Sequence, residues 1–221
     1  PGDDRGGSGR GGAGVREEEV RGRVCKLCRE PIPRARKMRA EREMAPSRGK
    51  VMTRRFHMSL SAGLEVEFPD ILEVQQENGK PRGLWYDVDL DWVRWVVGED
   101  YENDPRWMRP YLYEVFIDKA AVLKISSVEE LDAFHERYAR PLMPEMKMLT
   151  RIDWPEVARS WNGVEIAPYS WRRRLAPGFL WYYSWDCASG VIWNPVGLKK
   201  LQLIAKSKKE IQTFYRKYKQ K

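Results

Sequence analysis

Short stretches of alternating apolar and polar residues dominate the middle of this 221-residue chain, and they predict more strands than helices. Runs rich in Val, Ile, Phe, Tyr and Trp, bounded by turn residues, predict strands at 56–59, 84–86, 111–117, 122–125, 163–167, 181–185, 190–193 and 201–205. A Lys-Pro-Arg-Gly turn at residues 80–83 introduces the second of these strands.

Helical spacing and helix start signals predict four helices among these strands. Apolar residues at positions 92, 93, 96 and 97 form a stripe that predicts a helix over 91–97. Ser127, Asp153 and Ser207 are each followed three residues later by Glu, which is the capping-box signature of a helix start. The helix after Asp153 is expected to run through residue 161 and to stop at an Asn-Gly pair. Together these elements predict an α+β domain.

Charge divides the chain into three parts. Residues 1–56 hold 16 Lys and Arg against 8 Asp and Glu, and residues 199–221 hold 9 against a single acid, Glu210. Residues 57–198 hold 15 bases and 23 acids, so an acidic body carries two basic ends. The first segment is rich in Gly and charge, a composition that does not bury enough apolar surface to order itself. We therefore predict a weakly ordered basic segment over 1–51, a folded domain over 52–205 and a basic helix over 206–221.

Cysteine and histidine usage argues against a metal centre. Cys25 and Cys28, followed by Pro-Ile-Pro and basic residues, resemble the first half of the four-cysteine zinc finger of small bacterial transcription factors. The place of the second half falls near residues 46–47, where no cysteine stands, and structural zinc requires four ligands. With only His57 and His135 elsewhere, we expect no metal in this protein.

Several other classes of protein are disfavoured by missing patterns. The chain contains no run of 18 apolar residues and no secretory signal pattern, and its three cysteines cannot build a disulfide framework. These observations predict a cytoplasmic protein that does not enter a membrane. No GxxxxGK[ST] loop and no GxSxG elbow occur, which disfavours an NTPase and an α/β-hydrolase.

All ten tryptophans lie between Trp85 and Trp193. Each ring can bury on the order of 150–250 Å², so a cluster of this size exceeds what packing a core usually needs. Several of the rings also stand beside polar residues, as in Trp85-Tyr86-Asp87 and Trp185-Asp186. Two interpretations follow: large core residues with solvated N–H groups, or a cleft with aromatic walls for a flat ligand such as a nucleobase, a nicotinamide or a sugar face.

A series of short motifs over residues 56–205, in this order, carries a family resemblance. The motifs are Phe-His-Met-Ser at 56–59, Lys-Pro-Arg-Gly-Leu-Trp at 80–85, Asp-Leu-Asp-Trp at 89–92, the strand pair at 113–118 and 122–125, Trp-Asn-Gly-Val at 161–164 and Gly-Val-Ile-Trp-Asn-Pro at 190–195. They resemble the motifs of ADP-ribosyltransferases of the diphtheria-toxin-like and phage-encoded kind.

This resemblance implies a fold, a substrate and roles for particular residues. The fold of the family is a split pair of small antiparallel sheets that grip NAD⁺. His57, in its His-x-Ser context with Ser59, is then expected to bind the adenosine ribose, and Trp85 or Tyr86 to stack on the nicotinamide. The resemblance further implies that NAD⁺ is the substrate and that ADP-ribose passes to a protein or nucleic-acid acceptor.

The chain departs from the family at the expected catalytic acid. Family enzymes usually place a glutamate at the start of the closing strand, where this chain has Ser189. The nearest acids are Asp186, three residues earlier, and Glu165 on the neighbouring predicted strand. Either carboxylate could stabilise an oxocarbenium-like transition state, because cationic sugar chemistry needs a nearby negative charge rather than a particular backbone position.

Two interpretations without catalysis stay open beside the enzyme. In one, the aromatic residues stack on the bases of a nucleic acid while residues 172–174, all Arg, and the basic ends hold its backbone. In the other, the tryptophan-rich face and the basic C-terminal helix dock on a protein. The acidic body argues against the first, since its field repels a polyanion.

Overall fold

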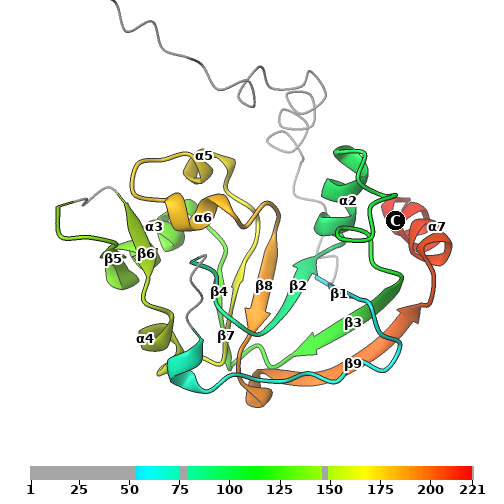
Figure 1. Ribbon diagram of the computed structural model, residues 1–221, viewed down its shortest axis with the longest axis horizontal. Coiled ribbons are helices and arrows are strands. Elements are labelled where there is room, and N and C mark those ends of the chain that lie inside the picture. Colours follow the sequence, from blue (N-terminus) through cyan, green and yellow to red (C-terminus); the bar gives the residue numbers. More distant parts are fainter. Residues whose placement is uncertain (1–52, 75–78, 146–148, 221) are drawn as a thin grey trace, which may run out of the picture. The chain divides into compact units, whose positions relative to one another are not determined.

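The computed structural model describes residues 53–74, 79–145 and 149–220, which all belong to one compact unit, Pro46–Lys221. The predicted weakly ordered segment over 1–51 and the half zinc finger at Cys25 and Cys28 lie outside the described residues. The described part is a mixed α+β fold, as the sequence predicts (Figure 1).

The strands are short, and most of them fall where alternation predicts them. They are β1 (Arg55–Ser59), β2 (Leu84–Val88), β3 (Tyr111–Ile117), β4 (Val122–Ile125), β5 (Ala139–Pro141), β6 (Thr150–Ile152), β7 (Gly163–Ile166), β8 (Ser189–Ile192) and β9 (Leu198–Ala205). The α-helices are α2 (Asp91–Gly98), α3 (Val128–Tyr138), α4 (Trp154–Ala158), α5 (Trp171–Arg174), α6 (Leu180–Tyr183) and α7 (Lys208–Lys219), with 3-10 turns η2 (Ile71–Glu73) and η3 (Pro195–Gly197).

Over the described residues, seven strands form one hydrogen-bonded sheet in the order β4-β7-β8-β2-β1-β3-β9, while β5 and β6 form a separate pair. Neighbours in the large sheet are antiparallel except β4 and β7, which run parallel. The sheet therefore differs from a purely antiparallel arrangement at its β4 edge.

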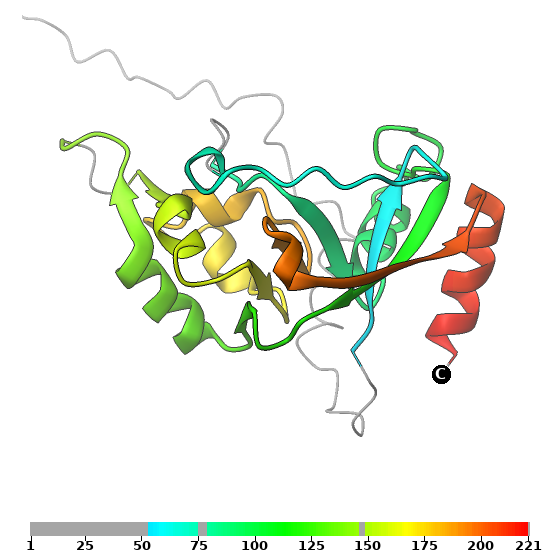
Figure 2. The ribbon, with the colours of Figure 1, turned by 90° about the horizontal axis from the view of Figure 1, so that it is seen from below.

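The centre of the sheet is its weakest connection. β1 pairs with β2 through Arg55↔Val88 and Phe56↔Asp87, whereas β2 pairs with β8, and β1 with β3, over four residue pairs each. From this short junction the halves β4-β7-β8-β2 and β1-β3-β9 diverge (Figures 1 and 2). Where β1 and β2 separate, the space between them can hold side chains from both strands.

Two apolar clusters stabilise the sheet. One cluster packs α3, α4 and α6 against β2, β7 and β8, and four tryptophans lie in it: Trp154, Trp181, Trp185 and Trp193. The other cluster joins β1 and β3 to α2 and α7 through residues such as Phe56, Leu112 and Ile211. The first cluster also includes Val115 and Ile117 of β3, so it extends across the junction between the two halves of the sheet.

The sequence prediction was wrong over residues 181–185, which include most of helix α6 rather than a strand. A strand would bury alternate residues, but Tyr183 is 48% exposed while Trp181, Tyr182 and Trp185 are buried. The buried positions are spaced as one side of a helix, which the high β-propensity of aromatic residues concealed. Helix α4 also ends at Ala158, earlier than predicted, and α5, β5 and β6 were not predicted.

Candidate ligand-binding site

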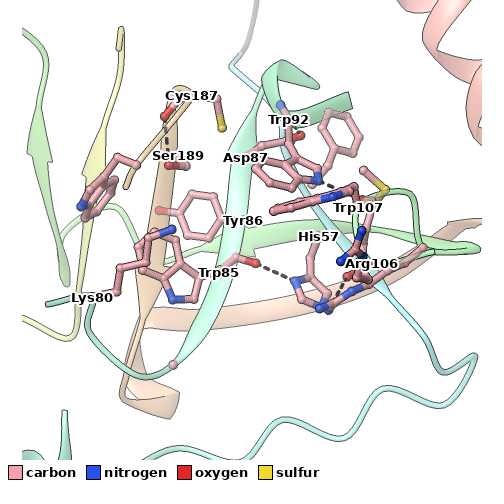
Figure 3. A pocket seen from close by; sticks show the side chains of 15 residues that line it. His57, Lys80, Trp85, Tyr86, Asp87, Trp92, Arg106, Trp107, Cys187 and Ser189 are labelled. Carbon is pink, nitrogen blue, oxygen red and sulfur yellow. Dashed lines mark hydrogen bonds between the residues drawn. The ribbon is translucent and has the colours of Figure 1, made fainter. Parts of the chain in front are cut away.

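A pocket of about 420 Å³ lies over the junction where β1 and β2 separate (Figure 3). Its lining comes from both strands, from the turn before β2, from α2 and the loop after it, and from the segment that leads into β8. The lining residues are Phe56, His57, Met58, Lys80, Gly83, Trp85, Tyr86, Asp87, Trp92, Arg106, Trp107, Arg109, Trp185, Cys187 and Ser189.

His57 extends from β1 toward β2, and the Nδ1 of its ring lies 2.6 Å from the Trp85 carbonyl oxygen. Because a carbonyl oxygen only accepts, Nδ1 carries the proton and donates it. Burial lowers the pKa of His57 and the charge of Arg109 lowers it further, against the effect of the Trp85 hydrogen bond. The ring is therefore neutral at pH 7, which leaves Nε2 as a hydrogen-bond acceptor.

The ring of Trp85 is fixed on several sides. Its Nε1 donates to the Pro81 carbonyl oxygen at 3.1 Å, and its ring meets Trp185 edge-on with centroids 4.9 Å apart. The Lys80 ammonium lies 5.0 Å from the centroid of the Trp85 ring, within the range of a cation–π interaction. A ring held in this way presents a flat surface of defined orientation to a ligand.

Tyr86 is 2% exposed, and burial raises the pKa of its hydroxyl well above the ordinary value, so it stays neutral. Its ring lies over Gly190 of β8, at the place where a Cβ on that glycine would overlap the ring and the hydroxyl. Gly190 therefore allows Tyr86 to lie flat across the neighbouring strand at the floor of the pocket.

The opposite side of the pocket has a second set of rings. Trp92 and Trp95 of α2 stack with centroids 4.9 Å apart, and Trp107 lies 5.8 Å from Trp92 and accepts a hydrogen bond from Trp92 Nε1 on its carbonyl oxygen at 3.2 Å. Arg106 and Arg109 line the pocket beside these rings. Figure 3 shows Trp85 and Lys80 on one side, Trp92, Trp107 and Arg106 on the other, and Tyr86 and His57 between them.

The structure thus brings together three of the six predicted site residues, His57, Trp85 and Tyr86, in one pocket with Ser189. Ser59 is not among its lining residues: it is 5% exposed, and its Oγ accepts the backbone N–H of Ser61 at 3.0 Å. That hydrogen bond stabilises the turn that ends β1 and does not itself argue for contact with a ligand.

The two predicted catalytic acids do not line this pocket either. Glu165 is 1% exposed and bonded through both oxygens to Arg55, at 2.5 and 3.0 Å. Asp186 accepts from Arg174 Nη2 at 2.9 Å; burial raises the pKa of its carboxyl, opposed by the charges of Arg174 and Lys80. Their catalytic role stays a prediction, and each is occupied by an arginine in this structure.

The sequence reasoning missed several lining residues, and one of them had a visible signal. Asp87 stands two residues after Trp85 in β2, so both side chains belong to the same face of the strand. Trp107, Arg106 and Arg109 come from the irregular segment between α2 and β3. Nothing in their local pattern indicates that the segment folds back toward β1.

No family model, no curated protein and no solved structure matches this chain. Over residues 53–74, 79–145 and 149–220 there is no group of three or more His, Cys, Asp or Glu arranged to hold a metal ion. Within the same described part, none of the helices combines the length and the apolar character needed to cross a bilayer.

Proposed function

We propose that the pocket binds NAD⁺ and that the protein is an ADP-ribosyltransferase-like enzyme. It would break the bond between nicotinamide and ribose and transfer ADP-ribose to a macromolecular acceptor. One observation carries the proposal: His57 of β1, Trp85 and Tyr86 of β2, and the start of β8 meet in one pocket, at the junction where the sheet divides. These are the strand positions to which the family resemblance assigns the NAD⁺ contacts.

The chemistry of the lining fits a dinucleotide. NAD⁺ has two flat rings joined by a diphosphate, and the pocket has aromatic rings on two sides, with Lys80, Arg106 and Arg109 among its lining residues. Aromatic faces stack on bases, and arginine is suited to bind phosphate oxygens in pairs. The free Nε2 of His57 is an acceptor for a ribose hydroxyl. A volume of about 420 Å³ is within the range of small-molecule sites.

Positioning supplies much of the catalysis in this proposal. Holding the ribose between the two halves of the sheet would fix its reacting carbon in one orientation, so that less entropy is lost on reaching the transition state. A carboxylate must still stabilise the ribosyl cation. For Glu165 to do so it would have to leave a buried two-point pair with Arg55, and breaking such a pair costs roughly 3–5 kcal/mol.

Calorimetry with NAD⁺ tests the proposal directly. We expect saturable binding to the full chain, and we expect His57→Ala and Trp85→Leu each to weaken it at least tenfold, because each removes a direct contact. His135→Ala is the matched control, since His135 bonds Trp181 Nε1 at 3.0 Å and does not line the pocket. Release of nicotinamide is followed in the same samples by chromatography. Absence of binding at millimolar NAD⁺, or equal losses in all three variants, would refute the proposal.

A second candidate function, nucleic-acid binding, is favoured by one specific surface. Lys199, Lys200 and Lys206 are exposed on or just after β9, at the edge of the sheet, and α7 adds Lys209 and Lys217 among its exposed residues. This basic surface suits a polyanion, either as a ligand in its own right or as the acceptor of ADP-ribose.

A further inference from the structure

Asp87 is a buried carboxylate of the pocket, and the family resemblance gives it no role. It stands at the fourth position of β2, is 6% exposed and belongs to the pocket lining. We propose that Asp87 is the catalytic carboxylate of this protein, which faces the ribosyl cation from β2 in place of the glutamate that the family has at the position of Ser189. This inference rests on the proposed function and identifies the acid that it needs.

The register of the sheet places Asp87 directly beside Ser189, the position at which the family has its glutamate. Asp87 is the direct partner of Ser189 in the antiparallel pairing of β2 with β8. Directly opposed residues of an antiparallel pair lie on the same face with their Cβ atoms about 4.5–5.5 Å apart. A carboxylate at 87 therefore reaches the space that a side chain at 189 would otherwise fill, and Ser189 is small enough to leave that space open.

Asp87 also has unused hydrogen-bonding capacity. Its Oδ2 accepts the backbone N–H of Trp92 at 3.0 Å, at the start of α2, which fixes the orientation of the carboxyl group. Its Oδ1 is buried and has no hydrogen-bond partner among the described residues. Buried polar atoms are normally paired, so an unpaired carboxylate oxygen in a pocket lining points to a ligand group that completes it.

The electrostatic surroundings of Asp87 suit a cationic ligand. Burial, followed by the negative charge of Asp91, raises the pKa of Asp87 well above its ordinary value, while the N–H groups of Trp92 and Val93 oppose this effect. The negative charge of Asp89 adds to the rise. The nicotinamide ring of NAD⁺ is cationic, and a cation in the pocket favours the ionised carboxylate. Binding of NAD⁺ and ionisation of Asp87 thus reinforce each other.

The reaction step balances without any further reagent. The bond from the ribose anomeric carbon to the nicotinamide nitrogen breaks, and its electron pair goes to that nitrogen, which leaves as neutral nicotinamide. The anomeric carbon becomes an oxocarbenium-like cation that the Asp87 carboxylate stabilises. An acceptor hydroxyl or a water then bonds to this carbon and loses its proton to Asp87, and from there to solvent.

The placement of Asp87 distinguishes it from the two acids predicted from sequence. Asp186 and Glu165 are each paired with an arginine, and neither lines the pocket. Asp87 lines the pocket and its bonded partner is a backbone N–H, so it needs no rearrangement before it acts.

Asp87→Asn is the test variant, because an asparagine oxygen still accepts the Trp92 N–H while the negative charge is removed. Asp153→Asn is the matched control. Asp153 also accepts a backbone N–H at the start of a helix, from Glu156 of α4 to its Oδ1 at 3.2 Å, but it does not line the pocket. Each variant is compared with the wild-type chain for NAD⁺ affinity by calorimetry and for nicotinamide release under single-turnover conditions.

We expect Asp87→Asn to lower the rate of nicotinamide release at least 100-fold, with NAD⁺ affinity within about fivefold of wild type, and Asp153→Asn to retain the rate within about threefold. Full activity of Asp87→Asn, or an equal loss in Asp153→Asn, would overturn the role of Asp87 and leave NAD⁺ binding intact. Wild-type binding without nicotinamide release would overturn it as well. Absence of wild-type binding would instead remove the proposed function itself.

Discussion

At the scale of single residues, the buried carboxyl of Asp87 affects how the stability of the folded state depends on pH. The folded state holds the pKa of this carboxyl above that of the unfolded chain, mainly through burial. Between those two pKa values the folded state binds more protons than the unfolded state, so stability falls as pH rises through that interval. Functional groups retained at such a cost are common in active sites.

Asp87→Asn should therefore be more stable than the wild type at pH 8, with a difference that shrinks toward zero as the pH falls below about 4, near the ordinary pKa of aspartate. Urea unfolding midpoints measured at pH 4, 6 and 8 give this comparison. If the negative charge of Asp87 instead stabilises the N-terminus of α2, the variant is less stable than the wild type at pH 8, which would contradict this expectation.

Gly190 provides a second test at the same scale. An added Cβ there would overlap the Tyr86 ring and hydroxyl as well as the Val164 carbonyl oxygen, so Gly190→Ala should cost about 1–3 kcal/mol of unfolding free energy. It should also weaken NAD⁺ binding by displacing Tyr86. Gly63→Ala is the control, because a Cβ on Gly63 meets nothing within 4 Å. Equal unfolding free energies for the two variants would contradict the packing of Tyr86 over β8.

At the scale of elements, two helices begin with the same reciprocal cap. Ser127 Oγ accepts the Glu130 N–H at 3.1 Å, and Ser207 Oγ accepts the Glu210 N–H at 3.2 Å. Ser127→Ala and Ser207→Ala should each lower the free energy of unfolding by about 1 kcal/mol. Ser126→Ala is the control, because Ser126 takes part in the first cap through its backbone N–H. Chemical denaturation measures all three, and a loss in the control as large as in Ser127→Ala would argue against the cap.

These caps also show why some elements could be predicted from the sequence. A capping box and an alternating strand are local patterns. The starts of α3 and α7 and the full extents of β3 and β4 were therefore predicted correctly. The aromatic run at 181–185 failed because its buried spacing is helical while its residue types favour strands. The loop that carries Arg106 and Trp107 could not be predicted, since its place beside β1 depends on tertiary packing.

Part of the pocket could also be predicted from the sequence. His57 and Trp85 stand out as a histidine and a tryptophan on strand patterns, and they meet through the Trp85 carbonyl. The position of Asp87 depends on which strand lies beside β2, and strand order is not a local property. Along the chain the acid nearest to Ser189 is Asp186, whereas the register places Asp87 beside Ser189 across the sheet.

At the scale of the whole unit, positive charge is concentrated at the C-terminal end of the chain. Residues 199–221 carry 9 Lys and Arg against one acid, while residues 57–198 are acidic overall. Exposed lysines on an edge strand discourage strand-to-strand association, and this role alone would account for those on β9. The lysines of α7 stand on a helix, where that explanation does not apply.

We therefore expect the basic surface of β9 and α7 to bind single-stranded nucleic acid through its phosphates. The test is fluorescence anisotropy of a labelled 20-nucleotide strand over a range of salt concentrations. The test variant is the double substitution Lys209→Glu/Lys217→Glu. The control is Lys119→Glu/Lys124→Glu, whose lysines are exposed in β4 and in the turn before it. Removing one lysine–phosphate ion pair reduces the slope of log affinity against log salt by about 0.7 for single strands, so the α7 variant should have a slope smaller by roughly 1.4. NAD⁺ affinity should be equal in both variants, because the pocket lining includes none of these lysines. An unchanged slope in the α7 variant, or an equal change in the control, would show that α7 does not hold the strand.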